Sequence, residues 1–274
     1  GVIVAETIAQ AEEAVKDMLS GNAFGDAGCK VVIEEFLEGE EASFIVMVDG
    51  KNSLAMATSQ DHKRVGNGDT GPNTGGMGAY SPAPVVTPDI HQRIMKEVIE
   101  PTVIGMAEEG NDYTGFLYAG LMIAADGTPK VIEYNCRFGD PETQPIMLRL
   151  QSDLPELCLN ALNGTLDQCT TEWDSRPSVG VVLAAGGYPA SYRKGDAISG
   201  LSNDESIGKT FHAGTTMNGD QVVTNGGRVL CATALGNTVT EAQANAYTLA
   251  KTLSWDGAFY RDDIAYRAIE RENT

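Results

Sequence analysis

A chain of 274 residues with 42% hydrophobic and 21% charged residues has the composition of an ordinary globular protein, long enough for two domains. Its formal net charge of −19 argues against nucleic acid or an anionic membrane as a partner, because phosphate surfaces attract basic proteins. No apolar run reaches the ~20 residues that span a bilayer, and no signal-peptide pattern opens the chain. Five scattered cysteines without a CxxC pair predict reduced thiols, and together these features predict a cytoplasmic protein.

The chain opens with the pattern of an α/β unit. Residues 2–5 predict a short buried strand. Thr7 and Gln10 then form a capping box before a run of apolar residues at helical spacing, and Gly21 ends that run.

An acidic stretch joins two predicted strands. Residues 30–36 and 42–48 are the strands, and an Asp49-Gly50 turn leads to a further apolar run over residues 53–57. The acidic stretch, residues 34–41, is a hinge whose backbone could meet an adenine edge, with a carboxylate beyond it for ribose hydroxyls. By composition alone, a solvated acidic loop is the favoured interpretation.

A glycine-rich run covers residues 66–80, after two cations in the stretch 60–64. Glycines allow close backbone approach, so successive N–H groups could cradle an anion. The run matches neither the Walker nor the dinucleotide glycine pattern, and a flexible loop is the alternative. A loop of about 15 residues inside a domain is nonetheless usually a lid, a binding loop or disordered.

The middle of the chain predicts a helix and then a hairpin. Thr87 and Pro88 open the helix, Pro101 should kink or divide it, and Gly110 ends it. Strands over residues 115–124 and 130–135 follow, joined by an Asp126-Gly127 turn. A second helix spans residues 153–163, with Ser152 as its cap and Gly164 at its end.

The sequence becomes polar between residues 163 and 178, and this change of composition predicts a domain boundary near Trp173. One domain would cover residues 1–173 and the other residues 174–274. The second domain reads as a small β-rich α+β unit. Its predicted strands cover residues 179–185, 222–223 and 228–235, and its helix begins at a capping box of Thr238 and Glu241.

The return strand of the hairpin carries the most informative residues. Side chains at alternate positions of a strand point to one side, so Glu133 and Asn135 share a face, and Arg137 joins them if the strand extends that far. A carboxylate and an amide carbonyl are oxygen ligands that suit Mg²⁺, and a guanidinium suits phosphate oxygens. The stretch therefore predicts a site for a metal-bound polyphosphate, although a strand running into a surface loop with an ion pair is about equally compatible with it.

Three long motifs resemble one family when taken together. Residues 33–41 (IEEFLEGEE), 71–80 (GPNTGGMGAY) and 137–144 (RFGDPETQ) are similar, in this order along the chain, to segments of the ATP-grasp ligases and, more narrowly, of the phosphoribosylamine–glycine ligases, also called glycinamide ribonucleotide synthetases. The resemblance extends through the C-terminal unit. It implies an α+β fold, with an ATP-grasp region of mixed and antiparallel sheets with flanking helices, followed by the small C-terminal domain.

The resemblance also implies a reaction and a set of site residues. ATP, glycine and 5-phosphoribosylamine would give glycinamide ribonucleotide, ADP and phosphate through glycyl phosphate, in purine biosynthesis. The nucleotide would contact Glu34, Glu35, Phe36, Leu37 and Glu41, and the metal, Mg²⁺ or Mn²⁺, would contact Glu133 and Asn135. Arg137 and Lys63 would be catalytic, and Asp61, Asn73, Thr74, Gly75, Gly76 and Gly78 would line the substrate pocket.

The chain departs from that family at its start. Gly1 lies where the family continues from an N-terminal domain and a glycine-rich loop with a lysine, so we expect the chain to be the C-terminal portion of a monomeric enzyme and to be inactive alone. There are two alternatives to this function: another ATP-grasp carboxylate–amine ligase, and a non-catalytic nucleotide-binding module.

Overall fold

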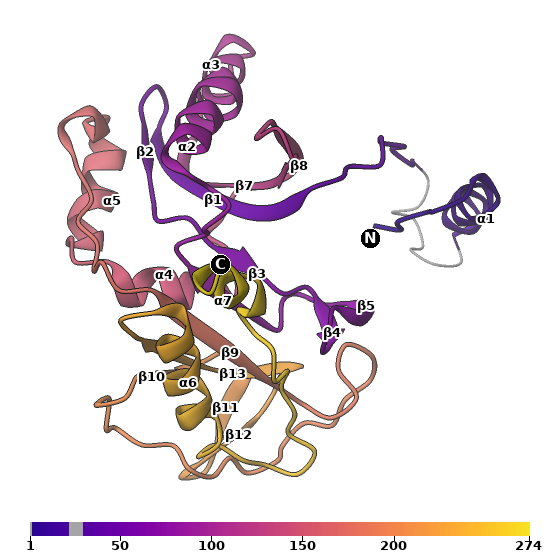
Figure 1. Ribbon diagram of the computed structural model, residues 1–274, viewed down its shortest axis with the longest axis vertical. Coiled ribbons are helices and arrows are strands. Elements are labelled where there is room, and N and C mark those ends of the chain that lie inside the picture. Colours follow the sequence, from indigo (N-terminus) through magenta and orange to yellow (C-terminus); the bar gives the residue numbers. More distant parts are fainter. Residues whose placement is uncertain (1, 22–29) are drawn as a thin grey trace. The chain divides into compact units, whose positions relative to one another are not determined.

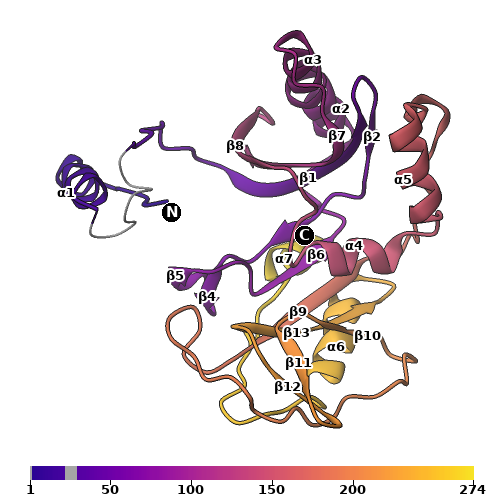
Figure 2. The same ribbon diagram turned by 180° about the vertical axis from the view of Figure 1, so that it is seen from behind.

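The computed structural model describes residues 2–21 and 30–274, which form two compact units, Gly1–Glu38 and Gly39–Thr274 (Figures 1 and 2). In the described part of the chain no helix has the length and apolar character needed to cross a membrane.

The first unit contains helix α1, Ile8–Leu19. The Thr7 hydroxyl oxygen accepts a hydrogen bond from the Gln10 N–H at 3.2 Å, and the Gln10 side-chain oxygen accepts one from the Glu6 N–H at 2.9 Å. The helix ends before Gly21, whose φ of +77° suits a residue without a side chain. The Thr7 cap and the glycine stop are thereby confirmed, whereas the Gln10 side chain accepts from the Glu6 N–H and not from the Thr7 N–H, as a capping box requires.

The predicted strands over residues 2–5 and 30–36 are wrong. Both stretches lack regular secondary structure, and Val32 and Ile33 are 82% and 79% exposed. A strand requires a neighbour that takes up its backbone hydrogen bonds, and no sheet of the described residues includes these stretches. Apolar, β-branched composition alone therefore did not make a strand here.

The second unit begins with a four-stranded antiparallel sheet in the order β2-β1-β7-β8. Its strands are β1 (Glu40–Asp49), β2 (Ser53–Ala55), β7 (Thr114–Ile123) and β8 (Pro129–Asn135), close to the predicted ranges. Alternate residues of β1 enter different cores. Phe44 and Val46 face the helices that follow residue 87, and Ile45 and Met47 face helix α5, Leu154–Asn163. Helices thus cover both faces of β1 (Figure 1).

The helical layer on one face is divided as the proline predicts. Helix α2 (Pro88–Ile94) runs into a π-helical segment (Met95–Ile99), and α3 (Glu100–Glu108) continues beyond it. Pro101 lies in the first turn of α3, where its missing N–H disturbs the regular hydrogen-bond ladder.

A five-stranded sheet, ordered β10-β13-β9-β6-β3, supports the other half of this unit. Its strands are β3 (Gln60–Asp61), β6 (Gly78–Ser81), β9 (Ser178–Ala184), β10 (Lys209–His212) and β13 (Arg228–Leu235). Helix α6, Val239–Ala250, packs on it through Ala242 and Ala246, and its predicted cap at Thr238 is confirmed. Strands from both sides of residue 173 share this sheet, and the division at residue 173 stays a prediction.

Several short elements complete the unit. The glycine-rich run is less irregular than predicted, because it contains the hairpin of β4 (Arg64–Gly66) and β5 (Thr70–Asn73) as well as β6. A hairpin of β11 (Thr215–Asn218) and β12 (Gln221–Thr224) and the 3-10 turn Leu166–Gln168 follow, and Leu166 and Val223 are buried. Two helices that we did not predict are α4, Thr143–Arg149, and α7, Tyr266–Glu272.

Candidate functional site

The register of β7 and β8 places Glu133 and Asn135 on one face of the four-stranded sheet. Glu133 lies opposite Gly120 and Asn135 opposite Tyr118, whereas Ala119 between these partners belongs to the core under α2 and α3. Directly opposed residues of an antiparallel pair point to the same side. The two oxygen donors thus share the face that looks away from α2 and α3, as the alternation predicts.

Strand β1 adds two polar residues to the same face. Ala42 and Phe44 enter the core under α2 and α3, so Glu41 and Ser43 point to the other side, with Glu133 and Asn135. The Glu41 carboxylate pairs with the Lys63 ammonium at 2.5 Å.

Lys63 is a cation that interacts electrostatically with several acidic side chains. Burial opposes its charge, but the carboxylates of Asp61, Glu41 and Glu133 outweigh that effect and raise its pKa. Lys63 therefore stays charged at neutral pH.

Asp61 and Glu142 are two further acids of this region, and Glu142 is buried. The Glu142 side chain is 3% exposed and accepts a hydrogen bond from the Ser43 hydroxyl at 2.8 Å. Burial, followed by the nearby charge of Glu142, raises the pKa of Asp61 to about 8, although Lys63 acts in the opposite direction. The folded protein hence holds a proton on Asp61 near neutral pH.

The Asp61→Asn variant is expected to gain stability over the wild type as the pH rises. The folded protein keeps the Asp61 proton to about pH 8, whereas the unfolded chain loses it near the ordinary pKa of 3.8. The stability that this carboxyl contributes is therefore complete at low pH and is lost as the pH rises from about 4 to about 8. Urea unfolding measures the free energy of unfolding of both proteins. The value for the variant minus that for the wild type should be about 1–3 kcal/mol larger at pH 8 than at pH 5. Equal differences at the two pH values would contradict the raised pKa.

The glycine-rich run lies directly beside Lys63. The Thr74 N–H and hydroxyl both donate to the Lys63 carbonyl oxygen, at 2.7 and 2.8 Å, and the Thr74 hydroxyl oxygen accepts from the Gly76 N–H at 2.9 Å. At Gly76 φ is +114°, and a Cβ atom would lie 2.3 Å from Pro141 Cδ. A Cβ atom at Gly78 would lie 2.6 Å from the Gly180 carbonyl oxygen. These glycines allow the run to approach the 139–142 loop and strand β9 closely.

The remaining predicted site residues are placed differently. Asn73 lies on the exposed β5 strand rather than in the loop beside Lys63. Arg137 follows the end of β8, so the alternation does not extend to it; its exposed guanidinium donates to the Phe138 carbonyl oxygen at 2.9 Å. Four of the five residues predicted to contact the nucleotide belong to the first compact unit and lie in irregular chain, with only Leu37 partly covered: Glu34, Glu35, Phe36 and Leu37.

Four side chains of this region were not predicted from the sequence: Ser43, Tyr118, Tyr188 and Arg228. The alternation in β1 would have grouped Ser43 with Glu41. Its hydroxyl lies 3.0 Å from the Tyr118 hydroxyl. Nothing in the local sequence marks Tyr188 or Arg228, because their contacts lie more than 80 residues away along the chain.

The oxygen donors on β8 fit a divalent cation. Among the described residues, no hydrogen bond or ion pair engages the side chain of Glu133 or Asn135, and no group of three or more histidine, cysteine, aspartate or glutamate side chains forms a metal cluster. Mg²⁺ usually takes only one or two protein oxygens and completes its shell with phosphate oxygens and water. A carboxylate beside an amide oxygen is a suitable donor set for this ion, whereas an all-protein metal cage is not formed.

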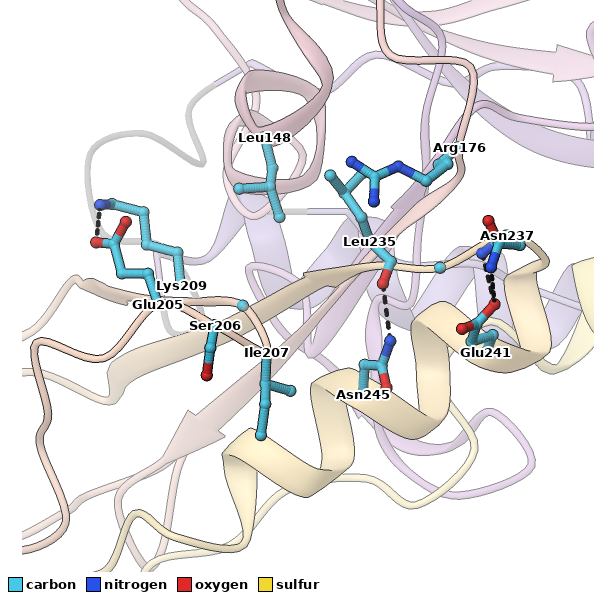
Figure 3. Close-up of a pocket in the computed structure, with 12 residues that line it drawn as sticks. Leu148, Arg176, Glu205, Ser206, Ile207, Lys209, Leu235, Asn237, Glu241 and Asn245 are labelled. Carbon is cyan, nitrogen blue, oxygen red and sulfur yellow. Dashed lines mark hydrogen bonds and ion pairs between the residues drawn. The ribbon is translucent and has the colours of Figure 1, made fainter.

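One cavity of about 400 Å³ lies apart from these residues. Figure 3 shows it between Leu148 on α4, Arg176, the 205–209 segment and the start of α6. Lys209 pairs with Glu205, and the Glu241 side chain accepts from Asn237, so charged and polar groups along its wall bond to one another. None of the predicted site residues lines this cavity.

Comparison with known proteins identifies the family. The model for the phosphoribosylglycinamide synthetase ATP-grasp (A) domain matches residues 1–143, and the model for the C domain of the same synthetase matches residues 178–267. The chain belongs to the phosphoribosylglycinamide synthetase family. The resemblance of the three motifs and the predicted α+β ATP-grasp fold are both confirmed.

Individual relatives agree with this assignment. The phosphoribosylamine–glycine ligase of Vibrio vulnificus is 74% identical over 273 residues, and that of Salmonella typhi is 70% identical over 274 residues. Each match covers 99% of this chain and 64% of the relative, so the chain spans less than two thirds of their length.

Solved structures show the same fold. The crystal structure of phosphoribosylamine–glycine ligase from Thermotoga maritima has a TM-score of 0.83 and 37% identity, covering 97% of this chain and 66% of that one. An L-amino acid ligase from Bacillus licheniformis, with a TM-score of 0.61 and 19% identity over 93% of this chain and 61% of that one, supports the fold alone.

Proposed function

We propose that the whole protein to which this chain belongs joins glycine to 5-phosphoribosylamine, using ATP and releasing glycinamide ribonucleotide, ADP and phosphate. The observation that carries the proposal is the presence of two oxygen donors, Glu133 and Asn135, on the same sheet face as the Glu41–Lys63 ion pair. Among the described residues, no hydrogen bond or ion pair engages either side chain. Support comes from relatives at 70–74% identity that are named phosphoribosylamine–glycine ligase. The proposed setting is purine biosynthesis in the cytoplasm, by a monomer.

Glu133 and Asn135 would hold a divalent cation, Mg²⁺ or Mn²⁺, which when bound would neutralise charge on the ATP phosphate oxygens. The exposed guanidinium of Arg137 would stabilise the transferring phosphoryl group. Its planar arrangement of N–H donors suits phosphate oxygens. Lys63, held charged by its acidic neighbours, would attract the glycine carboxylate and the same phosphoryl group.

The reaction would proceed in two steps. The glycine carboxylate attacks the γ-phosphorus, which forms glycyl phosphate and releases ADP. The amine of phosphoribosylamine then attacks the glycyl carbonyl, which forms the amide and expels phosphate. Positioning and charge stabilisation by the side chains would carry most of the catalysis, because phosphoryl transfer requires little covalent chemistry from the protein.

Nucleotide binding would use a backbone segment for the base and a carboxylate for the ribose. Residues 34–37 would meet the adenine edge, and Glu41 would accept hydrogen bonds from the ribose hydroxyls. Lys63 pairs with one oxygen of the Glu41 carboxylate, Oε2, so the other oxygen can accept from a ribose hydroxyl. Asp61 and the 74–78 run, next to Lys63, would line the substrate pocket.

An ADP-release assay on the full-length protein tests the proposal. Glycine and 5-phosphoribosylamine together should be required for steady ADP release, and a panel of other amino acids and amines should give little. Equal turnover with another amino acid would favour a different carboxylate–amine ligase. ATP binding without ADP release under every combination would indicate a non-catalytic nucleotide-binding module.

A further inference from the structure

Two side chains from the C-terminal part of the chain hold the backbone of Gly75 on both sides. The Tyr188 hydroxyl oxygen accepts a hydrogen bond from the Gly75 N–H at 3.0 Å, and the Arg228 guanidinium donates to the Gly75 carbonyl oxygen at 2.7 Å. Arg228 is the first residue of β13, and its side chain is only 21% exposed. The glycine-rich run is therefore fixed by residues more than 100 positions away along the chain.

The same guanidinium also holds the loop that follows β8. Arg228 Nη1 donates to the Asp140 carbonyl oxygen at 2.8 Å, and Nη2 donates to the Asp140 carboxylate at 3.1 Å. One planar fork thus joins the glycine-rich run to the 139–142 loop. A lysine, with a single ammonium on a flexible stem, cannot reproduce these contacts together.

Two glycines next to these contacts leave the space that Arg228 and Tyr188 occupy. A Cβ atom at Gly75 would lie 2.9 Å from Arg228 Cζ, and one at Gly227 would lie 2.3 Å from the Tyr188 ring. Side chains at either glycine would displace the residue that holds Gly75.

The contacts lead directly to the proposed catalytic groups. Gly75 follows Thr74, the N–H and hydroxyl of which bind the Lys63 carbonyl oxygen. The other residue that Arg228 contacts, Asp140, lies three residues after Arg137. Arg228 therefore bridges the two chain segments that carry Lys63 and Arg137.

We infer that Arg228, with Tyr188, is a positioning residue that sets the distance between the Lys63 and Arg137 segments. The C-terminal part of the chain would thereby determine how the glycine carboxylate oxygen is aligned with the γ-phosphorus that it attacks. The inference rests on the proposed function. It predicts an effect on the steps that involve glycine and not on the binding of ATP, because the hydrogen bonds of both side chains go to Gly75 and Asp140, next to the segments that carry Lys63 and Arg137.

The test uses Arg228→Lys and Tyr188→Phe in the full-length protein. Arg228→Lys keeps the charge but loses the fork, and kcat/KM for glycine should fall about 10-fold to 100-fold, the factor expected for lost hydrogen bonds to a charged group. Tyr188→Phe, which removes one neutral hydrogen bond, should give a decrease of about fivefold. KM for ATP should stay within about twofold of the wild-type value in both variants.

Amide hydrogen exchange gives a second readout that does not depend on turnover. Peptides that cover residues 70–80 and 138–142 should exchange faster in Arg228→Lys than in the wild type, and only the first should do so in Tyr188→Phe. The matched control is Arg193→Lys, since Arg193 is an exposed arginine that pairs with Asp196 and Asp256 away from these loops. It should leave both readouts unchanged.

The outcomes separate the two proposals. Unchanged exchange and unchanged kcat/KM for glycine in Arg228→Lys would overturn the positioning role, and so would an equal loss of ATP affinity. If the wild-type protein showed no glycine-dependent ADP release while the exchange differences appeared, the bridge would stand as a structural contact, and both the proposed function and the role in glycine alignment would fail.

Discussion

Replacing Glu133 by glutamine in the full-length protein is expected to lower kcat by about 100-fold to 1,000-fold, the range seen when one preorganised electrostatic contact to a transition state is removed. The change keeps the shape and the hydrogen-bonding capacity of the side chain but removes the negative charge that would attract a divalent cation. Asn135 alone, as a neutral oxygen donor, would hold the ion weakly, so the Mg²⁺ concentration for half-maximal activity should also rise. Both quantities can be measured in one titration of ADP release with Mg²⁺.

A matched control exists on the other side of the sheet. Glu108 is an exposed glutamate of α3, the helix that packs on the face opposite Glu133. Glu108→Gln removes the same charge from the protein and should leave kcat and the Mg²⁺ requirement unchanged. If the two variants behaved alike, Glu133 would have no role as a metal ligand.

Lys63→Met should reduce both turnover and stability. Methionine matches the length of the lysine stem but leaves Asp61, Glu41 and Glu133 without the cation that they surround. Loss of its charge from the phosphoryl-transfer site should lower kcat about 100-fold. Unfolding experiments at pH 8 should show a loss of about 1–3 kcal/mol, less than for a fully buried pair, because Glu41 and Lys63 are 42% and 28% exposed.

The pH dependence distinguishes this electrostatic effect from a packing effect. At pH 5 Asp61 is protonated in both proteins. At pH 8, near its pKa of about 8, it is partly ionised in the wild type but protonated in Lys63→Met, because Lys63 favours its charged form, so the loss should be larger at pH 8 than at pH 5. Lys51→Met, at an exposed turn between β1 and β2, is the control and should change stability little at either pH. A loss in Lys63→Met that is the same at pH 5 and pH 8 would refute the electrostatic explanation.

Local signals in the sequence predicted the elements that local chemistry determines. The capping residues Thr7 and Thr238 open helices in the structure as predicted, and the alternation in β8 placed Glu133 and Asn135 on one face. Helix α7 was missed because its N-cap, Ala265, has no side chain that can accept a hydrogen bond. Helix α4 was missed because Pro141 and Pro145 bracket its start and suggest an irregular loop.

Contacts between distant segments could not be predicted in this way. The stretches 2–5 and 30–36 look like strands by composition, but a strand depends on a partner that composition does not identify. The five-stranded sheet joins β3 and β6 to β9, about 100 residues later. The bridge from Arg228 to Gly75 and Asp140 also depends on that sheet, so no pattern within a short window of sequence could reveal it.

The most direct test of the account is a crystal structure of the full-length protein with Mn²⁺ and a non-hydrolysable ATP analogue, with anomalous diffraction used to locate the ion. We predict an anomalous peak about 2.1–2.3 Å from a carboxylate oxygen of Glu133 and from the side-chain oxygen of Asn135, with phosphate oxygens completing the shell. An ion bound to the phosphates but beyond bonding distance of both side chains would contradict it.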